Sequence, residues 1–147
     1  MKRIKLFDSE RGATLVEFAI AVTVFLTAMF AVIEFGRAIW VHNALTDAAR
    51  RGARYAVLHS ASDLGDVKNV VVYGDPAGGT QAMVPNLTTD NVTVTYSNYA
   101  VNRGTATVSI TGYQFQFVVP LIGTSIMMPN YTTTLPGESI GFIPANK

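Results

Sequence analysis

Apolar residues run almost without interruption from Ala13 to Ile33, and this stretch of about 21 residues contains no proline or glycine. A helix needs roughly 20 such residues to cross the hydrocarbon core of a bilayer. Charge returns at Glu34, but helical spacing continues on a stripe made mainly of alanine. We therefore predict one helix from about Ala13 to about Leu58, roughly 70 Å long, with its first half in lipid and its second half in water.

The pattern changes after a polar cluster at residues 60–65. Beyond it, threonine, valine, tyrosine and asparagine are frequent, and apolar positions alternate with polar ones. This alternation predicts short strands at residues 70–73, 92–96, 106–110 and 113–117, and an edge strand at residues 131–135 before Pro136. The alternation changes phase at Gly112, which is typical of a β-bulge.

These patterns predict an α+β fold, in which a long N-terminal helix packs on a small antiparallel β-sheet. The expected parts are a short basic leader (1–12), a transmembrane helix (13–33), its amphipathic continuation (34–58) and a small β-rich domain (59–147). The apolar run 117–128 contains Pro120 and Gly123 and is too short to span a bilayer. We expect it to lie in the core of the β-rich domain rather than to form an exposed patch for a neighbouring subunit.

Composition supports a chain with little water-facing surface. Charged residues make up 14% of the 147 residues and hydrophobic residues 49%, whereas soluble domains carry about 25% charged residues. The net charge of +1 gives no reason to expect nucleic acid as a partner. The absence of cysteine excludes disulfides, thiolate metal sites and cysteine nucleophiles. Lysine and arginine are balanced on the two sides of the apolar stretch, so charge does not set its orientation.

No catalytic or metal-binding pattern is visible in the sequence. His42 and His59 are the two histidines, and on one helix they would lie roughly 25 Å apart, too far to share a metal ion. No nucleophile, base and acid occur in a recognisable arrangement. We therefore expect a protein that is not an enzyme and uses no cofactor or metal.

Glu17 is the informative exception in the apolar stretch. A charged side chain near the centre of a membrane helix costs about 2.5–3.5 kcal/mol on insertion scales, so a carboxylate there indicates a partner or a function. If the chain is cut after Gly12, the new α-amino group of Ala13 is a cation at the start of the helix and Glu17 is the fifth residue. The alternative is an unpaired glutamate that reaches toward the membrane surface.

The segment from Gly12 to Glu17 resembles the cleavage signature of type IV prepilins, in which a glycine precedes a small or aromatic residue and a glutamate opens an apolar helix. Residues 33–38 (IEFGRA) and 48–56 (AARRGARYA) are similar to the TadE-like pseudopilins of tight-adherence secretion systems. The resemblance covers about residues 11–58, and over the rest of the chain it concerns architecture alone.

The resemblance implies a processing and assembly pathway. A prepilin peptidase would cleave after Gly12 and leave Ala13, where pilins often have phenylalanine, as the mature N-terminus. Glu17, with Phe18 beside it, would be needed for assembly with other pilin or pseudopilin subunits. The implied setting is the bacterial inner membrane, with membrane lipid and an assembly platform as partners and the C-terminal domain outside the cytoplasm. Family members act in adhesion, biofilm formation and secretion, in some cases within a surface filament.

The remaining charges allow more than one interpretation. Glu34 and Arg37 lie three residues apart, which predicts an ion pair on the helix surface where the helix leaves the membrane and favours this pairing over a specific docking role for a partner. Arg50, Arg51 and Arg54 are equally compatible with a surface for a partner or lipid headgroups and with a solvated helix face.

We expect a non-catalytic, pilin-like structural subunit, either a minor pseudopilin or a pilus subunit. The alternative is a single-pass envelope binding module, in which the helix is only a tether and the β-rich domain binds a ligand. A membrane enzyme is a weaker third hypothesis, because no catalytic cluster supports it.

Overall fold

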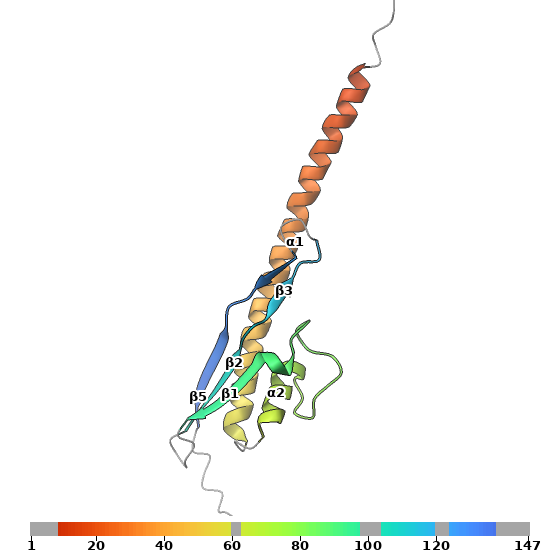
Figure 1. Cartoon of the computed structure of the whole chain (residues 1–147). Helices are drawn as coiled ribbons and strands as arrows, with labels where there is room; N and C mark the ends of the chain where they lie inside the picture. Colours follow the sequence, from red (N-terminus) through yellow and green to blue (C-terminus); the bar gives the residue numbers. More distant parts are fainter. Residues whose placement is uncertain (1–8, 60–62, 98–103, 120–123, 138–147) are drawn as a thin grey trace, which may run out of the picture.

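The computed structural model describes residues 9–59, 63–97, 104–119 and 124–137. Its dominant feature is α1, a single α-helix of 50 residues from Ser9 to Leu58. Figure 1 shows that the N-terminal half of α1 projects beyond the other elements, which pack along its C-terminal half. The predicted combination of a long helix and a small antiparallel sheet is thereby confirmed.

The two halves of α1 have opposite surroundings. Between Leu15 and Ile33 most large apolar side chains are exposed. From Val41 onward one face is buried, and that face consists mainly of alanines with Leu45 among them. The alanine stripe lets other elements lie close to the helix, as its small residues predict.

The second helix, α2 (Leu64–Tyr73), corrects the prediction of a strand at residues 70–73. Val67, Val70 and Val71 are buried on one face of α2, at the three- and four-residue spacing of a helix. Gly74 ends the helix in a left-handed conformation, with φ of 79°, and donates its backbone N–H to Val70 O. A short run of valines fits a buried strand and a buried helix equally well, so its pattern did not separate the two.

The main sheet has three antiparallel strands in the order β1–β2–β5: β1 (Val92–Ser97), β2 (Thr105–Ile110) and β5 (Tyr131–Pro136). Val94 faces Val108, which faces Thr133 on the other side. The alternation predicted for β2 is present, because Ala106, Val108 and Ile110 are all buried. The last strand lies at an edge of the sheet, also as predicted.

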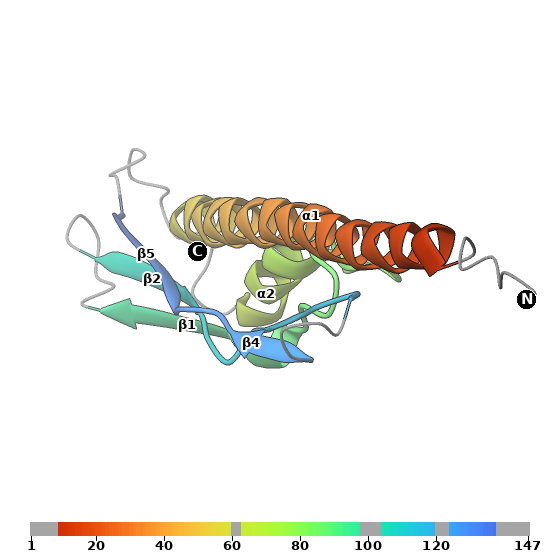
Figure 2. The same cartoon turned by 90° about the horizontal axis from the view of Figure 1, so that it is seen from above.

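A second, two-stranded sheet is formed by β3 (Gln114–Gln116) and β4 (Ser125–Met127), and we call it the hairpin. Gly112, with φ of 69°, lies between β2 and β3. The change of phase at this glycine is therefore a turn from one sheet to the other, not a bulge within one strand. In Figures 1 and 2 the hairpin lies beyond the main sheet, alongside α1.

The run 117–128 is not the core segment that its apolar composition predicts. Phe117 and Met128 are half-buried against the core, but Val118, Ile126 and Met127 are exposed. The expectation is wrong for these three residues because the hairpin extends past the main sheet. Residues 120–123 lie outside the described part of the chain.

Candidate functional site on the long helix

The proposed processing and assembly residues lie on the free half of α1. Gly12, Ala13, Glu17 and Phe18 are all exposed. Within the described residues, no ion pair or hydrogen bond involves the Glu17 side chain. Ala13 and Glu17 are four positions apart and so lie on the same face of the helix. The Glu17 side chain therefore points outward, and any counter-charge for it comes from outside the described part of the chain.

Glu34, in contrast, is buried and fully engaged, with 6% of its surface exposed. Its Oε2 forms an ion pair with Arg37 on the next turn of α1. Its Oε1 accepts hydrogen bonds from the backbone N–H groups of Val118 (3.0 Å) and Val119 (3.3 Å). One carboxylate therefore joins the helix to the chain that follows β3.

Arg37 completes this junction from the helix side. Its Nη2 donates a hydrogen bond to Gln116 O at 3.4 Å. Its guanidinium carbon lies 5.0 Å from the centre of the Phe115 ring, within the range of a cation–π interaction. We call Glu34, Arg37 and the backbone of residues 116–119 the hairpin clasp.

The ion pair predicted from the three-residue spacing is present, but the expected exposed position is wrong for Glu34. The sequence did not reveal the hairpin as its partner, because the groups that bind Glu34 are backbone amides. The absence of charged residues between Tyr113 and Tyr131 is the signal in the sequence that marks the hairpin region as unusual.

The three arginines near the end of α1 do not share one environment. Arg50 is exposed and lies 3.7 Å from Asp47, a surface pair that contributes little to stability. Arg54 is exposed as well. Arg51 is half-buried, and its Nη2 contacts Met83 Sδ at 3.3 Å. Arg51 thus packs against the segment after α2, whereas Arg50 and Arg54 form the outward face.

The two histidines have structural contacts. His42 Nδ1 lies 2.9 Å from Tyr131 Oη, which connects α1 to β5. Burial raises the pKa of Tyr131, and nearby Tyr113 adds to the increase, so the hydroxyl remains protonated at neutral pH. His59 stacks on Tyr55, with ring centres 3.7 Å apart. Among the described residues, no group of three or more His, Cys, Asp or Glu side chains is arranged to hold a metal ion.

The described part of the chain contains one helix that is long and apolar enough to cross a membrane, and this helix is α1. Residues 12–54 match the model of a protein family described as TadE-like protein. This part of the chain is similar to the TadE-like family. The resemblance noted in the sequence is thereby confirmed over these residues.

The TadE-like match ends before the β-rich domain begins, so the hairpin that contacts Glu34 lies outside it. No curated protein and no solved structure matches the chain. The match contains all of the candidate residues: Gly12, Ala13, Glu17, Phe18, Glu34, Arg37, Arg50, Arg51 and Arg54.

Proposed function

We propose that this chain is a pilin-like structural subunit, cleaved by a prepilin peptidase after Gly12 and then assembled into, or priming, a tight-adherence pilus-like filament. The observation that carries the proposal is Glu17, an exposed carboxylate on an unpacked apolar helix, five residues after Gly12 and within the TadE-like match.

Under this proposal, the exposed N-terminal half of α1 lies first in lipid and later in the core of a filament. Before assembly its exposed apolar side chains lie in lipid, because water would not solvate them favourably. In a filament, the same side chains pack against the helices of other subunits. The subunit therefore waits in the inner membrane with its β-rich domain outside the cytoplasm, in contact with the assembly platform.

Glu17 makes the movement of α1 from lipid into the filament depend on a neighbouring subunit. In an apolar surrounding a carboxylate is stabilised by a nearby cation, and removal of either partner leaves an uncompensated charge. Cleavage after Gly12 creates such a cation, the α-amino group of Ala13. We infer that Glu17 of one subunit faces the amino terminus of a neighbouring subunit, which couples processing to assembly.

The test is N-terminal mass spectrometry of the protein from membranes of cells with and without the prepilin peptidase. The expected result is a mature chain that begins at Ala13 only when the peptidase is present. An intact leader in both strains would overturn the proposal. It would make the single-pass binding module the better interpretation, with α1 as a tether.

A further inference from the structure

The end of the hairpin lies beside the position where the apolar stretch of α1 stops. The N–H groups of Val118 and Val119 bind Glu34, the residue directly after Ile33. Phe117 N donates to Thr124 O at 3.1 Å, which joins the two strands beyond β3 and β4. In Figure 1 the hairpin extends along α1 toward its N-terminal half. The hairpin therefore ends at the same level along α1 as the predicted membrane span.

Exposed apolar side chains lie at this level and on the part of the hairpin that leads to it, where Ile126 pairs with Phe115 and Met127 with Gln114. Val118, Ile126 and Met127 of the hairpin are 72%, 51% and 60% exposed. Ile33 and Phe35 of α1 are also exposed, on the two sides of Glu34 in the sequence. We call these five residues the apolar collar.

The collar carries almost no free charge. Glu34 is the carboxylate at this level, and it is buried by its contacts with Arg37 and the two backbone N–H groups. The sequence contains no charged residue between Tyr113 and Tyr131. A charge at membrane depth is tolerated when it is paired and hydrogen-bonded. The apolar surface of the span thus continues past Ile33 onto the hairpin.

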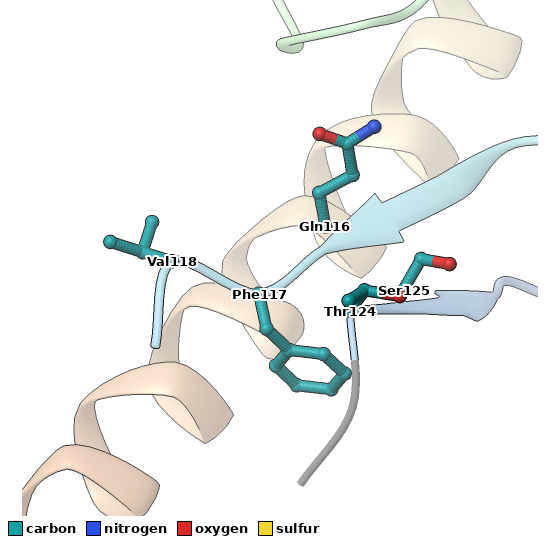
Figure 3. Close-up of a pocket in the computed structure, with 5 residues that line it drawn as sticks. All are labelled: Gln116, Phe117, Val118, Thr124 and Ser125. Atoms are coloured by element: carbon teal, nitrogen blue, oxygen red, sulfur yellow. The ribbon is translucent and has the colours of Figure 1, made fainter. Parts of the chain in front are cut away.

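The two faces of the hairpin indicate what covers it. Successive residues of a strand point to opposite faces, and Ile126 and Met127 are both exposed. Val118 points away from the strand pair in Figure 3, and it lines a hollow together with Gln116, Phe117, Thr124 and Ser125. Ile126 shares the face of the buried Phe115, whereas Met127 shares the opposite face with the exposed Gln114. One apolar side chain is thus exposed on each face, and a fluid layer can contact both faces at once, whereas a docked protein would cover one.

We propose that the apolar collar lies in the boundary between headgroups and acyl chains of the leaflet on the side of the β-rich domain. This inference rests on the membrane span of α1 that the proposed function requires. The collar is continuous with the lipid-facing surface of α1. The three exposed hairpin side chains alone are too few for a stable protein interface, which buries about 800 Å² on each partner, so before assembly lipid is the occupant that the neighbouring span of α1 supplies. The hairpin gives the domain a second contact with lipid, and the clasp holds it there.

The absence of cysteine in the chain permits an unambiguous labelling experiment. The full-length protein is prepared with Val118→Cys or Met127→Cys, labelled with an environment-sensitive fluorophore and placed in phosphatidylglycerol–phosphatidylcholine vesicles. Nitroxide lipids carry the quencher near the headgroup or near the acyl terminus. Because an interfacial segment lies about 5–10 Å deep, the headgroup-proximal quencher should act at least about twofold more strongly than the deep one at both positions.

Two further labels separate failure of the collar from failure of the membrane span. Thr95→Cys, at an exposed position on β1, should show no quenching. Ile20→Cys, in the apolar half of α1, should be quenched most by the deep nitroxide. Quenching at Ile20→Cys without quenching at Val118→Cys or Met127→Cys would overturn the collar and leave the span intact.

The remaining outcomes also decide the proposal. No quenching at Ile20→Cys would reject the span, and with it both the collar and the proposed function. A collar label whose emission shifts only at high protein-to-lipid ratio, without nitroxide quenching, would identify a second copy of the chain as the occupant. That result would overturn the proposal of lipid contact.

Discussion

Glu17 and Glu34 are two glutamates on one helix whose charges are satisfied in different ways. Glu34 is enclosed by Arg37 and by two backbone N–H groups of the same chain. Glu17 is exposed and has no such partner among the described residues. The first carboxylate is therefore part of the fold, whereas the second is available to another molecule. This difference leads to opposite predictions for their substitution.

Glu17→Ala should leave folding and cleavage unchanged but lower the amount of assembled filament at least about tenfold, because the neighbouring amino terminus loses its counter-charge. The amount of subunit in the sheared filament fraction measures assembly, and N-terminal mass spectrometry measures cleavage. Ile20→Ala is the matched control, since it removes an exposed apolar side chain but no charge from the same part of α1, and it should lower assembly far less than Glu17→Ala. Wild-type filament levels for Glu17→Ala would contradict the proposed mechanism.

Glu34→Gln should loosen the hairpin, because a neutral amide binds the two N–H groups and Arg37 more weakly than a carboxylate does. Hydrogen bonds to charged groups contribute about 1.5–3 kcal/mol, and the partial exposure of Arg37 reduces the loss to about 1–2 kcal/mol. Hydrogen exchange at Val118 and Val119 is the direct readout, and it should become faster.

The control for Glu34→Gln is Asp47→Asn, which also removes a carboxylate three residues before an arginine of α1. Asp47 and Arg50 are exposed, so this change should alter stability by less than about 0.5 kcal/mol. Unchanged exchange at Val118 and Val119 in Glu34→Gln would show that the clasp does not hold the hairpin.

For single residues, the sequence predicted the ion pair of Glu34 with Arg37 but not the burial of Glu34. The spacing of Glu34 and Arg37 is a local feature that is readable without a fold. The partners of Glu34 in the hairpin are backbone N–H groups more than 80 residues away in the chain. Every residue except proline has such a group, so no side-chain pattern identifies the two that are used.

Among the elements, α1 was predictable and α2 was not, for related reasons. A long apolar run followed by an alanine stripe fits a helix and excludes a strand by its length. The ten residues of α2 are too few for this distinction. Their helical state depends on the valines packing against α1 and β1, which is a tertiary contact.

The close approach of α1 and α2 depends on Gly52. A Cβ atom added at Gly52 would lie 2.3 Å from Val71 Cγ2 and 3.3 Å from Val108 Cγ1. Gly52→Ala should therefore destabilise the domain by about 1–3 kcal/mol through overpacking, measured by chemical denaturation of the detergent-solubilised protein. The double variant Gly52→Ala/Val71→Ala should recover part of this loss, because the second change removes the clashing methyl group.

Gly36→Ala is the matched control on the same helix, because a Cβ atom there would meet nothing within 4 Å. In a helix interior alanine is more favourable than glycine by about 0.5–1 kcal/mol, so this variant should be slightly more stable than the wild type. Equal stability of the Gly52→Ala protein and the wild type would mean that α2 can move away from α1 without lowering the free energy of unfolding.

For the whole molecule, the important division lies within α1 rather than between α1 and the sheet. The core consists of residues from Val41 onward, together with α2 and the strands. The apolar half of α1 covers none of it. The apolar run that ends at Ile33 and the alanine stripe that follows it predicted this division. The position of the hairpin at the end of the span required the structure.

A chain that begins at Val32 should therefore be soluble and folded, because it retains the clasp and the entire core. Its denaturation, followed by the loss of helical circular dichroism, should show one cooperative transition. A chain that begins at Ala38 lacks both Glu34 and Arg37. It should keep the same core but exchange the amide hydrogens of Val118 and Val119 faster. Aggregation or loss of cooperativity in the chain that begins at Val32 would show that the apolar half of α1 is needed for folding as well as for membrane contact.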